Sequence, residues 1–181
     1  MVGYTFYEYD NRVRRYAETL ARRGDSVDVI AVGGGTVPLG QEDISGVTAH
    51  RIQRRERNER YKWSYLWRLL RFLCASSVFL TRRHHRIRYD LVHIHNIPDF
   101  LVFAAWYPKW TGAKLILDIH DIVPELFVSK FKSKSVAPYI WLLKKIEKAS
   151  AAFVDHVSFP TIFGNKRWFR GRCSGKSALS F

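Results

Sequence analysis

The feature that most constrains the fold is a strand, helix, strand unit between residues 89 and 120. Residues 89–95 (YDLVHIH) and 114–120 (KLILDIH) are short runs rich in β-branched and aliphatic side chains, which is typical of buried strands. Pro98 predicts the start of a helix between them, and Gly112 predicts its end. A helical crossover of this length predicts that the two strands are parallel neighbours, joined in the right-handed sense.

A second unit lies nearer the start of the chain. Residues 27–32 (VDVIAV) predict another buried strand, between Gly24 and the three glycines at 33–35. Asp10 or Asn11 is expected to cap a helix before this strand, and Gly24 is expected to end it. Apolar residues recur through that helix at the spacing of one face: Val13, Tyr16, Ala17, Leu20 and Ala21.

Weaker patterns complete the predicted sheet. Residues 46–52 predict a strand towards an edge, residues 137–148 predict a helix, and residues 151–158 predict a further strand. A sheet of this kind normally begins with a central strand. Because only residues 1–5 precede the first helix, we expect that first strand to be shortened. The alternation predicts an α/β fold with a Rossmann-like open parallel sheet and helices on both faces.

The length of 181 residues fits one domain, which we expect at residues 1–158. Residues 159–181 carry five Lys or Arg, no acid and no sustained apolar period, so they predict a basic tail outside the pattern of the domain. We expect a cytoplasmic protein for three reasons. The sequence has two cysteines, it shows no secretory leader, and it has no uncharged run of eighteen apolar residues.

Polar side chains gather where the predicted strands end. In open parallel sheets, ligands bind beyond the carboxyl ends of the strands, which singles out His95 and Asn96 together with His120 and Asp121. His93, His95 and His120 could offer three imidazoles to a metal ion. The sequence has neither a CxxC pair nor a carboxylate-rich pattern near them, so we expect no metal site.

The charge of the chain is strongly positive, with 30 Lys+Arg against 16 Asp+Glu. Residues 51–90 alone carry twelve Lys or Arg and three acids, interleaved with aromatic and leucine side chains. This pattern fits a peripheral helix on an anionic bilayer, such as the inner face of the plasma membrane, and fits equally a core helix with a basic flank. No RNA-binding module is recognisable, so we expect no nucleic acid partner. The residues expected to contact a membrane are Arg54, Arg55, Trp63, Trp67, Arg68 and Arg71.

Three stretches carry a family resemblance. They are residues 9–32 (YDNRVRRYAETLARRGDSVDVIAV), residues 89–125 (YDLVHIHNIPDFLVFAAWYPKWTGAKLILDIHDIVPE) and residues 145–157 (KIEKASAAFVDHV). The second is the most specific, because IHN-x-PD, GAK and HD-x-x-PE occur in order. Together they resemble the amino-terminal domain of family 4 glycosyltransferases, the retaining enzymes of GT-B fold, over most of residues 4–158.

The resemblance implies transfer of a sugar from a nucleotide-diphosphate sugar to an acceptor, with anomeric retention and with no bound metal or tightly bound cofactor. His120 matches the family histidine that contacts the donor sugar and supports the transition state. Asp121 and Glu125 match neighbours in the same loop. The other positions implied at the substrate are Asn11 and Arg12 at the first helix start, with His95 and Asn96 at the strand end.

The resemblance covers the amino-terminal domain alone, so we expect the family's carboxyl-terminal donor domain to be absent from these 181 residues. The resemblance therefore implies the acceptor-side, amino-terminal half of a GT-B enzyme of surface polysaccharide or glycolipid synthesis. Its partner would be a sugar or lipid-linked acceptor, and the chain would be inactive unless a separate chain supplies the donor half. The alternative is a non-catalytic basic protein that binds an anionic membrane surface.

Overall fold

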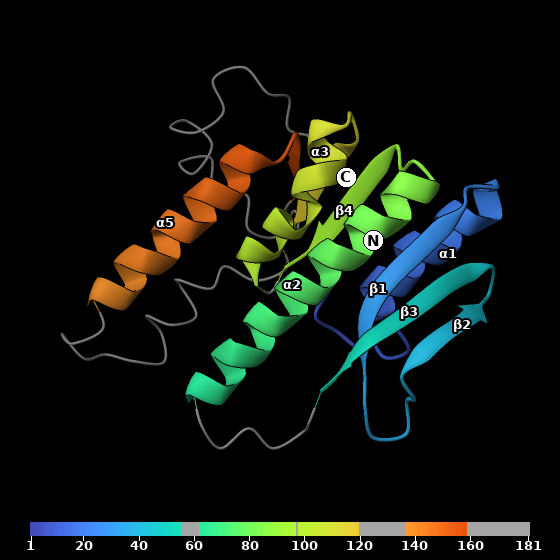
Figure 1. The fold of residues 1–181 in the computed structure, drawn as a ribbon, viewed down its shortest axis with the longest axis horizontal. Helices are drawn as coiled ribbons and strands as arrows, with labels where there is room; N and C mark the ends of the chain where they lie inside the picture. The colour runs from blue at the N-terminus through green and yellow to red at the C-terminus, as the bar shows by residue number, and fades with distance from the viewer. Residues whose placement is uncertain (56–61, 97, 120–136, 159–181) are drawn as a thin grey trace.

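A computed structural model describes residues 1–55, 62–96, 98–119 and 137–158 (Figure 1). The strands form two three-stranded arrays, in the orders β1-β3-β2 and β4-β5-β6. Every strand pair is parallel except β2 with β3. The strands are β1 (Val27–Gly33), β2 (Gly40–Ile44), β3 (Val47–Arg54), β4 (Leu91–His95), β5 (Lys114–Asp118) and β6 (His156–Ser158).

Val2 joins the two arrays. It forms parallel bridges to Ile30 of β1 and to Ile94 of β4, and its side chain is fully buried. The Val2 amide donates to the carbonyl oxygen of His93 at 2.9 Å, and its own carbonyl accepts from the amide of His95 at 2.9 Å. Val2 therefore takes the central place of the sheet, between β1 and β4.

Helix α1 (Asn11–Arg23) has the ends that the sequence predicts. Asp10 is the N-cap, and Gly24 ends the helix in the left-handed conformation at φ 98°, where a glycine avoids the steric cost of a side chain. Val13 and Ala17 are its buried residues. They pack with alternate residues of β1, such as Val29, in one of two hydrophobic clusters.

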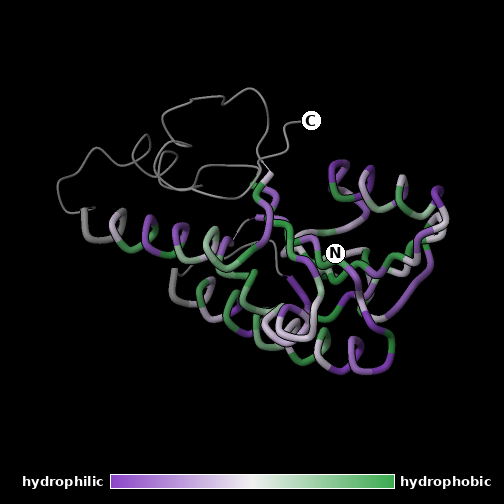
Figure 2. Tube along the Cα trace, turned by 90° about the horizontal axis from the view of Figure 1, so that it is seen from above, coloured by the Kyte–Doolittle hydropathy of each residue, from purple (hydrophilic) through white to green (hydrophobic). Residues whose placement is uncertain are grey.

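The opposite face of the sheet is covered by the remaining helical segments. They are α2 (Lys62–Arg86), the 3-10 segment η1 (Asp99–Ala105), α3 (Trp106–Trp110) and α5 (Ala137–Phe153). Phe72 of α2 and Leu101 of η1 share the larger hydrophobic cluster with Ile30 and Ile94. Figure 2 shows α1 and α2 on opposite sides of the strands. The predicted α/β fold, with a largely parallel sheet and helices on both faces, is confirmed.

Two predicted strands differ from the structure. The strand predicted at 46–52 is β3, but it lies inside its array because β2 pairs along its outer side. The sequence pattern misses β2, whose residues are mostly polar or glycine and almost all exposed. The strand predicted at 151–158 is confined to β6, because α5 continues to Phe153. Ala149, Ala151 and Ala152 favour helix, which explains the extension.

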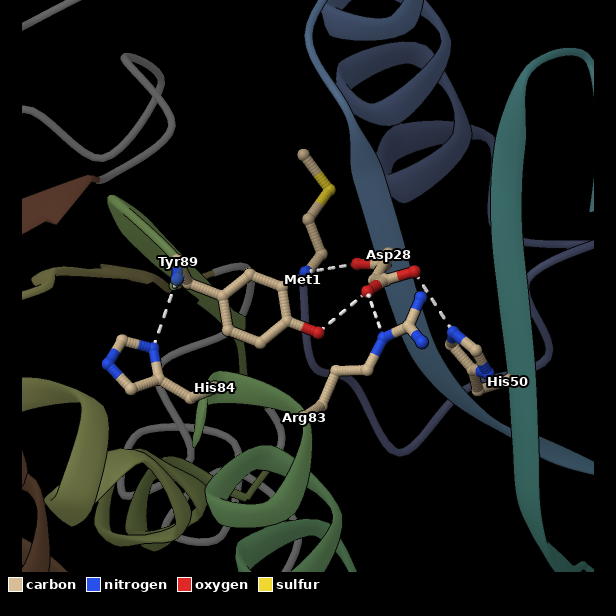
Figure 3. Close-up of polar contacts among 6 residues, drawn as sticks. All are labelled: Met1, Asp28, His50, Arg83, His84 and Tyr89. Carbon is tan, nitrogen blue, oxygen red and sulfur yellow. Dashed lines mark hydrogen bonds and ion pairs between the residues drawn. The ribbon is translucent and has the colours of Figure 1, made fainter. Parts of the chain in front are cut away.

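A polar cluster joins α2 to the amino ends of the strands (Figure 3). Asp28 of β1 accepts from the Tyr89 hydroxyl at 2.6 Å and from Arg83 Nε at 3.1 Å, while His50 Nε2 lies 3.0 Å from its other oxygen. Burial acts to raise the pKa of Asp28, but the three hydrogen bonds outweigh it and hold that pKa well below its ordinary value. The cluster lies near the amino ends of the strands, whereas the residues that the sequence predicts at a ligand site follow their carboxyl ends.

Candidate functional site

A pocket of about 230 Å³ opens at the carboxyl ends of the central strands. The residue after Val2, the end of β4 and the residue after β3 all contribute to it, as the strand-end rule for α/β sheets predicts. Tyr65 of α2 and the helix cap of α1 complete the wall. The lining residues are Gly3, Tyr4, Thr5, Asp10, Arg55, Tyr65, His95 and Asn96.

The end of β4 brings His95 and Asn96 to this pocket, as the sequence predicts. The Asn96 amide donates to the carbonyl oxygen of Asp118 at 3.0 Å, and its side-chain Nδ2 donates to Asp99 Oδ1 at 2.5 Å. Burial raises the pKa of Asp99, although the hydrogen bond from Asn96 acts in the opposite direction. The orientation of the Asn96 side chain is thus fixed by the start of η1.

Asp118, the last residue of β5, links the predicted site residues and has a fully buried side chain. Arg12 Nη2 donates to its Oδ1 at 3.2 Å, and His95 Nδ1 lies 3.5 Å from its Oδ2. One carboxylate therefore connects the start of α1 with the ends of β4 and β5. Asp118 is the one acid within residues 114–120, the run that predicts this strand, and that is the signal by which the sequence could have identified it.

His93, His95 and Asp118 also offer metal-ligand atoms, all within 4.8 Å of one another. The two imidazole rings lie 4.3 Å apart between centroids, with the Tyr16 ring 5.3 Å from that of His93. The Arg12 guanidinium already rests on Asp118, and its positive charge opposes a second cation there. The donor set therefore fits an ion-pair network better than a metal centre.

The start of α1 places Asn11 and Arg12 differently. The Asp10 carboxylate accepts hydrogen bonds from the amides of Arg12 and Val13, both at 3.1 Å, so these amides are engaged by the helix's own cap. Asn11 is exposed, whereas the Arg12 side chain reaches towards Asp118. Of the two, Arg12 is held beside the strand ends.

Arg55 lies in the pocket, although the sequence predicts it as a membrane contact. Its Nη1 donates to the carbonyl oxygen of Tyr4 at 3.2 Å, and its guanidinium carbon lies 5.1 Å from the centre of the Tyr4 ring. Sequence reasoning misses Tyr4, Thr5 and Tyr65 as pocket residues. The rule that selects His95 would also select Tyr4 and Thr5, because they follow the central Val2.

The other predicted membrane contacts fall on two different parts of the surface. Trp67 is 69% exposed on α2, and Arg54 and Arg71 are also exposed. Arg68 is half-buried, and its carbonyl oxygen accepts from Gln53 at 3.0 Å. The side chain of Trp63 lies outside the described residues. No helix in the described part of the chain is long and apolar enough to cross a membrane.

Three predicted site residues, His120, Asp121 and Glu125, follow β5 in the sequence, and all three lie outside the described residues. The basic tail predicted at 159–181 lies outside them as well. Ile119 is the last residue described before His120. It is buried, and its amide donates to the carbonyl oxygen of Ser158 at 3.0 Å.

Comparisons with known proteins agree with this architecture. The model of the glycosyl transferase 4-like domain family matches residues 9–163. A sucrose-phosphate synthase from Thermosynechococcus elongatus superposes with a TM-score of 0.67 at 17% identity, covering 93% of this chain and 41% of that one. A second sucrose-phosphate synthase structure from that organism gives a TM-score of 0.62 at 14% identity, covering 99% of this chain and 86% of that one.

These structural similarities establish the fold alone, because both identities are low. The chain spans about two fifths of the length of the first sucrose-phosphate synthase structure. No protein of curated function matches the sequence.

Proposed function

The chain belongs to the glycosyl transferase 4-like family, and from this premise we propose that it forms the acceptor-binding half of a retaining glycosyltransferase with a nucleotide-diphosphate sugar as donor. The observation that carries the proposal is the pocket at the carboxyl ends of the central strands, which is lined by two tyrosines, Arg55, His95 and Asn96. Aromatic rings and a few polar groups around a small concave site suit the apolar faces and hydroxyls of a sugar.

In the proposed reaction, separate groups of residues act on the acceptor and on the donor sugar. Acceptor residues in this pocket orient a sugar hydroxyl, and His120 contacts the donor sugar and stabilises the charge that develops on it. Asp121 and Glu125 take part in binding the substrate. Asp118 and Ile119, which directly precede His120 in the sequence, are held by contacts to Arg12 and Ser158.

The donor is proposed to bind to a domain outside residues 1–181, in the same or a separate chain. This is supported by the 41% of the first sucrose-phosphate synthase structure that the chain covers. Residues 1–181 alone would then not transfer sugar, since half of the cleft and most donor contacts are supplied elsewhere. The proposed acceptor is a sugar or a lipid-linked sugar of surface polysaccharide or glycolipid synthesis.

The test is made in the source cells, where any donor-binding domain is present. His120→Ala is compared with His85→Ala, a control on the exposed part of α2. Incorporation of labelled sugar into the polysaccharide and lipid fractions is expected to fall at least about a hundredfold with His120→Ala and to be unchanged in the control. Sugar transfer by the isolated chain that His120→Ala leaves undiminished would contradict the proposal.

A second candidate function, binding of an anionic membrane, rests on an exposed apolar and basic surface. The amino-terminal ends of α2 and α5 lie at the same end of the molecule in both views (Figures 1 and 2). The two helices expose large apolar side chains there, namely Leu66, Trp67, Leu70, Trp141 and Leu142. Arg71, Lys144 and Lys145 are exposed beside them, as the headgroups of anionic lipids require.

This second function is tested by co-sedimentation with vesicles of anionic and of neutral phospholipid. Binding to the anionic vesicles that weakens with added salt is expected. Arg71→Gln should weaken it, and Arg22→Gln on α1, which lies across the sheet, is the matched control. Binding that is indifferent to salt and to lipid charge would remove this candidate and leave the transferase proposal standing.

A further inference from the structure

One residue of the pocket, Arg55, carries a charge that forms no ion pair with any described carboxylate. Arg55 donates from Nη1 to a neutral carbonyl oxygen, that of Tyr4, at 3.2 Å. Its guanidinium carbon lies 5.1 Å from the Tyr4 ring centre and 6.0 Å from that of Phe6. Among the described residues, no carboxylate lies within ion-pair distance of it.

Other arginines of the fold have acidic partners. Arg51 contacts Glu8 and Glu42, and Arg12 contacts Asp118. The one carboxylate that lines the pocket belongs to Asp10, and it accepts from two amides of α1. Arg55 thus differs from these arginines because its remaining donors face a pocket rather than an acid.

Arg55 is also held in place before any ligand arrives. Its backbone amide donates to the carbonyl oxygen of Gly33 at 2.7 Å, which fixes the chain just after β3. The guanidinium lies over the Tyr4 ring and within cation–π distance of the Phe6 ring, and Tyr65 packs edge-on against Tyr4 with ring centroids 6.4 Å apart. A guanidinium held by these contacts has less conformational entropy to lose when its donors bind an anion.

We propose that Arg55 selects an acceptor that carries an anionic group, the carboxylate of a uronic acid or the phosphate of a sugar phosphate. This inference rests on the proposed function, because it names the substrate class of the same pocket. Carboxylate and phosphate oxygens match the guanidinium fork, and these charge-assisted hydrogen bonds are about twice as strong as neutral ones. The pocket of about 230 Å³ is smaller than the ~300–1,000 Å³ of drug-sized sites, so it suits a single sugar unit.

The test measures binding of three sugars to the full chain by isothermal titration calorimetry at low salt. Methyl glucuronide carries a carboxylate, glucose 1-phosphate carries a phosphate, and methyl glucoside is neutral. Arg55→Gln removes the charge, and Arg55→Lys keeps the charge without the fork. Arg54→Gln is the matched control, because Arg54 is the adjacent, exposed residue at the end of β3.

At least one charged sugar is expected to bind more tightly than methyl glucoside and to lose about tenfold in affinity with Arg55→Gln. Arg55→Lys should lose less, and Arg54→Gln should change the affinity by less than about twofold. The sugar that responds to Arg55→Gln identifies the anion as carboxylate or phosphate. Thermal unfolding of each variant checks the fold, and Arg55→Lys serves as the test if Arg55→Gln does not fold.

Two outcomes would overturn the inference. One is equal affinity for charged and neutral sugars, and the other is an equal loss with Arg54→Gln and Arg55→Gln, which would indicate unspecific attraction. Methyl glucoside that binds as tightly as both charged sugars would remove the substrate class and leave the transferase proposal intact. The labelling experiment with His120→Ala tests that proposal separately.

Discussion

Arg12 and Asp118 lie 106 residues apart in the chain and form an ion pair of 3.2 Å. The Asp118 side chain is fully buried, whereas that of Arg12 is 33% exposed. A partly exposed arginine therefore neutralises the charge of a carboxylate that solvent does not contact. The pair fixes the start of α1 against the end of β5.

Arg12→Ala is expected to lower the free energy of unfolding by about 2 kcal/mol, because it leaves the buried carboxylate with His95 as its remaining described ionic partner. Arg14→Ala is the matched control. Arg14 pairs with Glu18 one turn away on α1, where both side chains are partly exposed, and such i,i+4 pairs contribute about 0.5 kcal/mol or less. Equal losses in urea unfolding would show that the pair with Asp118 adds no more than a surface contact.

Asp28 provides a prediction about pH. Because its pKa is lowered in the folded state, the folded protein resists protonation of this carboxylate. The resulting stabilisation is fully present above about pH 4, the range of an unfolded aspartate, and is lost as the pH falls from there. Asp28→Asn is expected to lower the free energy of unfolding by about 2 kcal/mol at pH 7.

The measurement is urea unfolding of the two proteins at pH 7, 5 and 3. The difference between them should be nearly constant from pH 7 to 5 and smaller at pH 3, because the Asp28 carboxylate of the unfolded wild-type chain takes up protons there while that of the folded protein stays ionised. Asp25→Asn is the control, since Asp25 pairs with Arg23 on the surface. A difference that stays the same down to pH 3 would contradict the lowered pKa.

The parts of the fold that the sequence predicts well are those that local patterns determine. Strands β1, β4 and β5 are short apolar runs, and α1 has an amphipathic period with a cap at each end. Strand β2 (Gly40–Ile44) has no such pattern. It exists because it pairs with β3 across a tight turn at Ser45 and Gly46, both with positive φ. A polar edge strand of this kind is formed by its pairing partner rather than by its own residues.

The candidate site shows the same division. His95 and Asn96 are predicted because they follow a recognisable strand. Tyr65 and Arg55 enter the pocket from α2 and from the end of β3, which the packing of α2 across the sheet brings together. Their positions depend on tertiary structure, which the local sequence does not show. The basic and aromatic segment at residues 51–90 therefore predicts a membrane contact at Arg55, although Arg55 and Tyr65 line the pocket.

Two adjacent glycines beside the pocket give a prediction about Arg55. Gly34 has φ 140°, and a side chain there would collide with the carbonyl oxygen of Arg55. Gly35 has φ 61° and open space around it. Gly34→Ala is therefore expected to cost at least about 2 kcal/mol and to displace Arg55, whereas Gly35→Ala should cost about 1 kcal/mol from backbone strain alone.

Urea unfolding of both variants measures the costs, and titration with the charged sugars measures the displacement. Sugar affinity should fall for Gly34→Ala and be unchanged for Gly35→Ala. If the two variants behave alike, the close approach of residue 34 to the strand end is not what positions Arg55.

Two adjacent leucines of α2 separate its core face from its candidate membrane surface. Leu69 is 5% exposed and belongs to the larger hydrophobic cluster, whereas Leu70 is 40% exposed beside Trp67. Leu69→Ala is expected to lower the free energy of unfolding by about 2–4 kcal/mol, because it leaves a cavity in the core. Leu70→Ala should cost less than about 1 kcal/mol, since Leu70 is exposed and belongs to neither hydrophobic cluster of the described residues.

Vesicle binding should show the opposite order. Leu70→Ala removes apolar surface that could enter a bilayer, so it is expected to weaken binding to anionic vesicles, whereas Leu69→Ala should leave that binding unchanged at temperatures where it remains folded. If neither leucine affects vesicle binding while Leu69→Ala alone affects stability, α2 is a core helix with a solvated basic flank. The arginines around its exposed face would then act in solubility, and the pocket would be the remaining candidate for a binding surface.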